Sequence, residues 1–166
     1  MGFGEGSNFK RKETARDVHK VTEITTTSYT IGEAENGHIL AINAAAGANA
    51  TVTLPADTLP VGWNIKIMLL ASMAAEGLGS PGTWKIASAD DDLMFGAYQA
   101  VSIAAAQEAD VFAANGSSNA HLVFDSGAKG TYAGSWLEFF LMGENEWVVR
   151  GEVYVAGTPA SAWSDT

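Results

Sequence analysis

Acidic and histidine side chains are the residues of this sequence best able to hold a metal ion or to transfer protons. Residues 90–92 are three consecutive aspartates, and hard cations such as Ca²⁺ are bound by several carboxylate oxygens. Three adjacent side chains cannot all face one ion, and the spacing of a calcium-binding loop is missing. His19, His38 and His121 lie in different predicted elements, without zinc-motif spacing. We therefore expect a solvated acidic turn at residues 90–92, and neither a metal nor a cofactor.

Two further patterns are candidates for enzyme chemistry. Residues 77–82 (GLGSPG) fit the G-x-G-x-x-G motif of dinucleotide-binding turns, but Pro81 and Gly82 would break the helix that must follow it. The last predicted hairpin carries four glutamates that could supply the carboxylate pair of a glycoside hydrolase: Glu138, Glu144, Glu146 and Glu152. Their alternating or turn positions are more typical of an exposed polar face. We therefore expect a flexible loop at residues 77–82 and no enzymatic activity.

Charge is distributed unevenly along the chain, whose net charge is −10. The first twenty residues hold five basic and three acidic residues, a balance of +2, and the rest hold four and sixteen, a balance of −12. An acidic body repels phosphate, which argues against nucleic acid as a partner. We expect residues 1–20 to be an extended arm that binds an acidic protein surface, with a solvated tail as the alternative. The arm residues expected to contact a partner are Phe3, Phe9, Lys10, Arg11, Lys12, Arg16 and Lys20.

Cysteine content and hydropathy exclude several classes of protein. The chain has no Cys, so it has neither disulfides nor thiolate metal ligands. No apolar run approaches the ~18–20 residues of a membrane-spanning helix, so we expect no membrane partner. The first residues also lack the apolar segment of a secretory signal. A single globular domain is expected at residues 21–156, followed by a tail at residues 157–166.

Short alternating runs separated by turn residues predict the elements of this domain. The run ATVTL (residues 50–54) ends at Pro55, and a corner containing Pro60 and Gly62 leads into a second run that begins at Trp63. Similar runs recur at about eight- to twelve-residue spacing, which is typical of a β-sandwich or barrel. The dipeptide at residues 36–37, Asn-Gly, predicts a hairpin. We predict an all-β fold: an antiparallel, jelly-roll-like β-sandwich with an extended N-terminal arm.

The tryptophans divide into two groups. Trp63, Trp84, Trp136 and Trp147 begin or lie within strand runs, which predicts packing in the core or between subunits, with an exposed carbohydrate platform as the alternative. Trp163 lies instead in a Gly-, Pro- and Ser-rich segment with no predicted strand around it. A large aromatic residue there is expected to dock on a neighbouring subunit or back on the body. We include Trp163 among the residues expected to bind a partner.

Three segments resemble a module of tailed-bacteriophage structural proteins. They are TTTSYTI, HILAINAAAGANATVTLPA with a glycine after the second Leu-Pro corner, and the closing WLEFFLMGENEWVVRGEV, and the resemblance covers residues 24–153. Such modules are small β-sandwiches that typically assemble as trimers in tail fibres, tail accessory proteins and capsid decoration (cement) proteins. The chain lacks the long fibrous segment of a tail fibre. A short basic arm and one compact domain look more like a cement protein.

The resemblance implies a viral structural protein. We expect a homotrimer that binds the major capsid protein on the capsid exterior of the virion, stabilises the shell and is made in the host bacterial cytoplasm. The alternative is a tail-tip or receptor-binding module that recognises a host surface glycan. A glycan hydrolase that uses a glutamate pair is a third, weaker interpretation.

Overall fold

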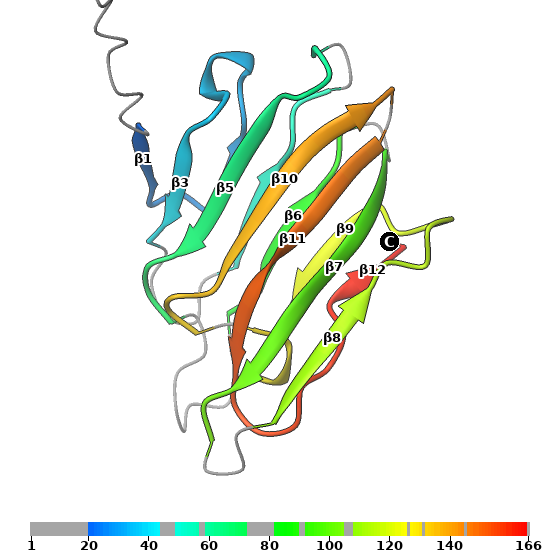
Figure 1. Cartoon of the computed structure of the whole chain (residues 1–166). Helices are drawn as coiled ribbons and strands as arrows, with labels where there is room; N and C mark the ends of the chain where they lie inside the picture. Colours follow the sequence, from blue (N-terminus) through cyan, green and yellow to red (C-terminus); the bar gives the residue numbers. More distant parts are fainter. Residues whose placement is uncertain are drawn as a thin grey trace, which may run out of the picture.

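The fold consists of two β-sheets, which Figure 1 shows one in front of the other in a computed structural model. The structure describes residues 20–43, 49–56, 59–72, 82–89, 92–104, 108–125, 127–130, 132–144 and 146–165. The front sheet has seven strands, in the order β1 (Val21–Ile24), β3 (Ile39–Ile42), β5 (Asn64–Leu69), β10 (Trp136–Gly143), β11 (Glu146–Val155), β7 (Leu93–Ser102) and β8 (Ala109–Ala113). The rear sheet has five, in the order β12 (Trp163–Ser164), β9 (His121–Phe124), β6 (Trp84–Ala87), β4 (Ala50–Thr53) and β2 (Ser28–Thr30). The described residues add two 3₁₀ turns, η1 (Glu33–Glu35) and η2 (Gly127–Lys129). The prediction of an all-β fold is confirmed.

The first six strands alternate between the two sheets, and this alternation makes both sheets mixed. β1, β3 and β5 are parallel neighbours in one sheet, and β2, β4 and β6 are parallel neighbours in the other. A parallel pair needs a crossover connection, and here the crossover is a strand of the opposite sheet. Later strands add antiparallel pairs, such as β10 with β11, although β11 and β7 are parallel. Five of the ten described strand pairs are parallel, so neither the predicted antiparallel pairing throughout nor a jelly roll is confirmed.

The turn at residues 36–37 shows why the hairpin prediction fails. Gly37 does adopt a positive φ of 74°, but the turn carries the chain from β2 in one sheet to β3 in the other. Its polar groups bond to the start of β5: Asn36 Oδ1 accepts from the Asn64 amide at 2.9 Å, and the Gly37 amide donates to Asn64 O at 2.7 Å. The indole of Trp63 adds a hydrogen bond to Glu33 O at 3.1 Å. Contacts with a distant strand therefore fix this turn, and no hairpin partner is needed.

The side chains between the sheets form one core, and most of the predicted inward positions lie in it. Ile65, Ile67 and Leu69 of β5 are buried, as are most of the alternate residues of β10 and β11.

Trp63 and Trp147 meet edge to face with ring centroids 5.8 Å apart, and Trp84 stacks on Phe124 at 4.4 Å. Core packing is thus confirmed for three of the four strand tryptophans. The fourth, Trp136, lies on the outer face of the seven-stranded sheet.

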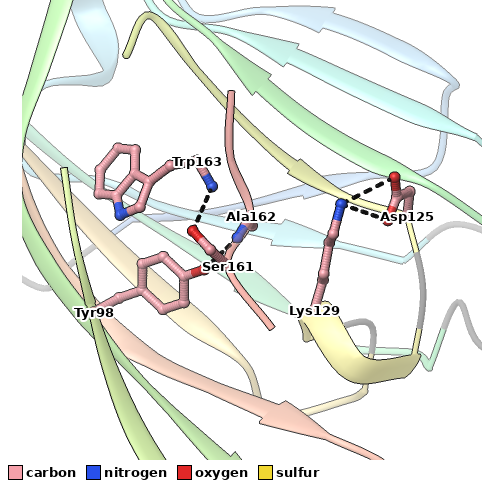
Figure 2. Close-up of polar contacts among 6 residues, drawn as sticks. All are labelled: Tyr98, Asp125, Lys129, Ser161, Ala162 and Trp163. Carbon is pink, nitrogen blue, oxygen red and sulfur yellow. Dashed lines mark hydrogen bonds and ion pairs between the residues drawn. The ribbon is translucent and has the colours of Figure 1, made fainter. Parts of the chain in front are cut away.

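The C-terminal segment packs against the body (Figure 2). Ala162 is buried, and its amide donates to the hydroxyl of Tyr98 at 2.6 Å. The next residues form β12, which pairs antiparallel with β9. A further bond, from the Ala160 amide to Ala128 O at 2.8 Å, ties the segment to η2. The described part of the expected tail is therefore packed against the body and includes β12, a two-residue edge strand of the five-stranded sheet.

Candidate functional site

Two of the eight residues expected to bind a partner belong to the described part of the chain. Lys20 is exposed and directly precedes β1, and its carbonyl accepts a hydrogen bond from the Ile39 amide at 2.9 Å. The basic segment therefore joins the body at the β1 edge of the seven-stranded sheet. The other arm residues, Phe3, Phe9, Lys10, Arg11, Lys12 and Arg16, lie outside the described residues.

Trp163 packs on its own molecule, one of the two alternatives expected for it. Its indole Nε1 donates to Phe112 O in β8 at 3.0 Å, and its ring lies 5.9 Å from the ring of Tyr98 in β7. Its backbone meanwhile pairs with Leu122 of β9 in the other sheet. Trp163 therefore joins the edges of both sheets, and this accounts for a half-buried tryptophan without a partner molecule.

The outer face of the seven-stranded sheet brings three charged side chains together. Strand register places Lys66 of β5, Glu138 of β10 and Arg150 of β11 side by side. Arg150 Nε donates to Glu138 Oε2 at 2.7 Å, and Lys66 Nζ lies 3.9 Å from Glu138 Oε1. One carboxylate therefore lies between two cations. We call these three residues the charge row.

Two aromatic rings support the cations of the charge row. Lys66 Nζ lies 4.1 Å from the ring centroid of Trp136, and Arg150 Cζ lies 4.9 Å from that of Phe140. Both distances are within the range of cation–π attraction. The rings and the carboxylate together restrict the rotamers of two long side chains that would otherwise be mobile. Each cation therefore has both an aromatic ring and a carboxylate as neighbours on the sheet surface.

A hollow of about 330 Å³ opens beside the charge row. It is lined by the charge row, Asn64, Ile65, Phe140 and residues 37–39 from the turn before β3. His38, one of the lining residues, has a buried Nδ1 atom for which the described structure provides no hydrogen-bond partner. Buried polar atoms of this kind are uncommon in native proteins and need an explanation such as a bound water, ion or ligand.

Strand alternation in the sequence does not reveal this site. The sequence predicts that Glu138 belongs, with the other glutamates of the last hairpin, to an exposed polar face. Glu144 and Glu146 are indeed exposed, whereas the side chain of Glu138 is only 22% exposed because Lys66 and Arg150 flank it. Glu152 is half-buried, and a hydrogen bond from the Tyr154 hydroxyl to Glu152 raises the pKa of Tyr154. Alternation predicts that these side chains point outward, but only strand register shows which of them meet.

The outer face of the five-stranded sheet has a different composition. The outward positions of β2 and β4 carry four hydroxyl side chains, and those of β6 and β9 carry one lysine, one histidine and two small or aliphatic residues. The eight residues are Ser28, Thr30, Thr51, Thr53, Lys85, Ala87, His121 and Val123. None of them is acidic, although the chain has 19 acidic residues. We call this surface the hydroxyl face.

The acidic turn at residues 90–92 differs in part from the expectation of a solvated turn. Asp92 is buried at 3% exposure, and its Oδ2 accepts from the Trp147 indole at 3.3 Å. This buried carboxylate therefore orients a core tryptophan. Residues 90 and 91 lie outside the described residues.

Within the described part, no three His, Asp or Glu side chains are grouped to hold a metal ion. No described helix has the length and apolar character needed to cross a membrane.

Comparisons with known proteins give no match for this chain, whether with family models, with curated proteins or with solved structures.

Proposed function

We propose that this protein is a capsid decoration protein of a tailed bacteriophage, which binds the major capsid protein on the outer surface of the shell as a homotrimer. The observation that carries the proposal is the hydroxyl face. The eight residues of this surface include four hydroxyl side chains and no carboxylate, on a chain whose net charge is −10. Charged residues are depleted in the core of protein interfaces. We assign the hydroxyl face to contact with the shell.

The uneven charge of the chain supports the same function. The basic residues of segment 1–20 complement an acidic surface, whether on the shell or on the body of a neighbouring copy. The segment joins the body at Lys20, beside the edge strand β1, where a neighbouring extended chain can add to the sheet. Trimer formation would raise the effective concentration of each contact, so individual contacts need not be strong. Binding only to the assembled shell would stabilise it by mass action.

The face assignment is tested by substituting an arginine on either sheet. Thr51→Arg places a long charged side chain in the middle of the hydroxyl face, and Gln99→Arg places the same side chain on an exposed position of the other sheet. Capsids assembled without this protein are incubated with each variant and sedimented. We expect Thr51→Arg to lose attachment and Gln99→Arg to attach like the wild type. Equal attachment of the two variants would show that the hydroxyl face does not contact the shell.

The role of the basic segment is tested separately. Deletion of residues 1–20 is expected to leave a folded domain that no longer attaches. Reversing the charges of Lys10, Arg11, Lys12 and Arg16 is expected to weaken attachment, most strongly at low salt, where screening is weakest. Full occupancy by the truncated protein would remove the arm from the proposal. Light scattering of the purified protein checks the predicted trimer.

The second candidate function is a tail-tip or receptor-binding module for host surface glycan, which the hollow beside the charge row favours. Quantitative mass spectrometry of purified virions separates the two functions. A decoration protein is expected at a copy number comparable to that of the major capsid protein. A tail component is expected at a small fraction of it.

A further inference from the structure

We propose that the hollow beside the charge row is a binding site for a carboxylate-bearing saccharide, such as a uronic or sialic acid unit. The hollow opens on the outer face of the seven-stranded sheet. That face is opposite the hydroxyl face, so shell contact and ligand binding can occur together. The inference does not depend on the capsid role, and it specifies the ligand class of the second candidate function.

Charge selects for an acidic ligand. The charge row has two cations and one carboxylate, a local excess of +1 on a chain whose net charge is −10. A ligand carboxylate would balance this excess. The Arg150 side chain is 66% exposed and donates to Glu138 through Nε, so its guanidinium can still reach a ligand from the solvent side. Hydrogen bonds between charged groups are the stronger kind, and a guanidinium can bind a carboxylate through two nitrogens.

The other lining groups suit a hydroxylated ring. A sugar hydroxyl both donates and accepts, so its site needs fixed donors and acceptors beside an apolar surface. The Asn64 amide is held by a bond from Nδ2 to Gly62 O at 3.1 Å, and Glu138 is held by the charge row. Phe140 and Ile39 provide the apolar part of the lining. His38 also lines the hollow, and its buried Nδ1 atom has no hydrogen-bond partner in the described structure.

The shape favours a small ligand over a protein segment. A volume of about 330 Å³ lies at the lower end of the range for small-molecule sites, roughly 300–1,000 Å³. An acidic peptide could also place a carboxylate between the two cations. It would make little use of the side-chain amide of Asn64. The test therefore includes an acidic peptide as a competing ligand.

The experiment uses the full-length protein and an array of uronic-, sialic- and other carboxylate-bearing saccharides, each with a neutral counterpart. Hits are measured by calorimetry, and a glutamate-rich peptide is measured alongside them. The variants are Lys66→Gln, Arg150→Gln and Arg150→Lys. Lys129→Gln is the matched control, because it removes a cation that lines neither the hollow nor the hydroxyl face. Circular dichroism checks that each variant folds.

We expect acidic saccharides to bind about tenfold or more tightly than neutral counterparts, with affinity falling as salt rises. Arg150→Gln and Lys66→Gln should each weaken binding by about tenfold, Arg150→Lys by less, and Lys129→Gln should have no effect. Four results would overturn the inference: an array without acidic hits, equal binding of neutral counterparts, unchanged binding by the Arg150 and Lys66 variants, or Arg150-dependent binding of the peptide alone. The last would reassign the hollow to a protein partner.

Discussion

Replacing Tyr98 with phenylalanine tests how the C-terminal segment is held on the body. The Tyr98 hydroxyl accepts a hydrogen bond from the Ala162 amide at 2.6 Å, and both residues are at 1% exposure. Phenylalanine keeps the ring but removes the acceptor. The Ala162 N–H would then be buried without a partner, which costs about 1–3 kcal/mol.

The expected loss is therefore about 2 kcal/mol in the free energy of unfolding at neutral pH, or roughly 4–8 °C in Tm for a domain of this size. Urea denaturation followed by tryptophan fluorescence measures it. Tyr132→Phe is the control, because Tyr132 is only half-buried and lies outside the core cluster. The control is expected to change stability by less than about 0.5 kcal/mol.

The pH dependence makes this prediction more specific. Burial raises the pKa of Tyr98 to about 12, from 10.0. Below pH 10 the phenol is protonated in both the folded and the unfolded state, so its contribution to stability is fully present. As pH rises from 10 through 12, the unfolded state loses the proton first, and the contribution falls by about 2.7 kcal/mol in all, at 1.36 kcal/mol per pKa unit.

The stability curves of the wild type and Tyr98→Phe should therefore converge between pH 10 and 12. Tyr29 and Tyr154, whose pKa values are also raised, are present in both proteins, so their contributions cancel in the difference. A stability difference that stays constant over this pH range, or is absent at pH 7, would refute the reasoning.

Two further predictions test the sheet packing and the C-terminal strand. Gly96 has a φ of 95°, and an added Cβ would lie 2.2 Å from Val149 O, so Gly96→Ala should cost at least about 3 kcal/mol in urea denaturation. Gly37→Ala is the control: Gly37 has a φ of 74° with open space around it, so the substitution should cost only about 1–2 kcal/mol. Equal losses of stability in the two variants would contradict the close pairing of β7 with β11 at Gly96. Trp163→Ala should cost about 2 kcal/mol and make the C-terminus the first site of limited proteolysis, because the bond to Phe112 O is lost. A C-terminus that stays protected would show that β12 is held without the indole.

Local pattern predicted the strands well because alternation follows from the pleat of a single strand. Ile65 and Ile67 were expected to point inward from β5, and both are buried. The corner between ATVTL and Trp63 was also predicted correctly, because Pro55 and Gly62 act through their own backbone preferences. These inferences needed no information about distant residues.

Predictions that depended on a partner strand were less accurate. The Asn-Gly dipeptide at residues 36–37 favours a hairpin locally, yet the polar groups around it bond to Asn64 and place the following strand in the other sheet. Trp163 showed no strand pattern around it, because β12 is only two residues long and is defined by its pairing with β9. The charge row was not predicted, because Lys66, Glu138 and Arg150 are on three different strands. The order of these strands in the sheet cannot be inferred from the sequence pattern of any one of them.

The sequence by itself determined that the chain is built of β-strands, where most of those strands lie and which of their side chains face the core. Side-chain alternation is a property of each strand alone, so it can be recognised without knowing the fold. Only the tertiary structure decided the parallel pairing, the docking of the C-terminus and the meeting of two cations with one carboxylate. The backbone hydrogen bonds of a sheet are nearly the same for any sequence, so strand order is chosen by how the whole core packs.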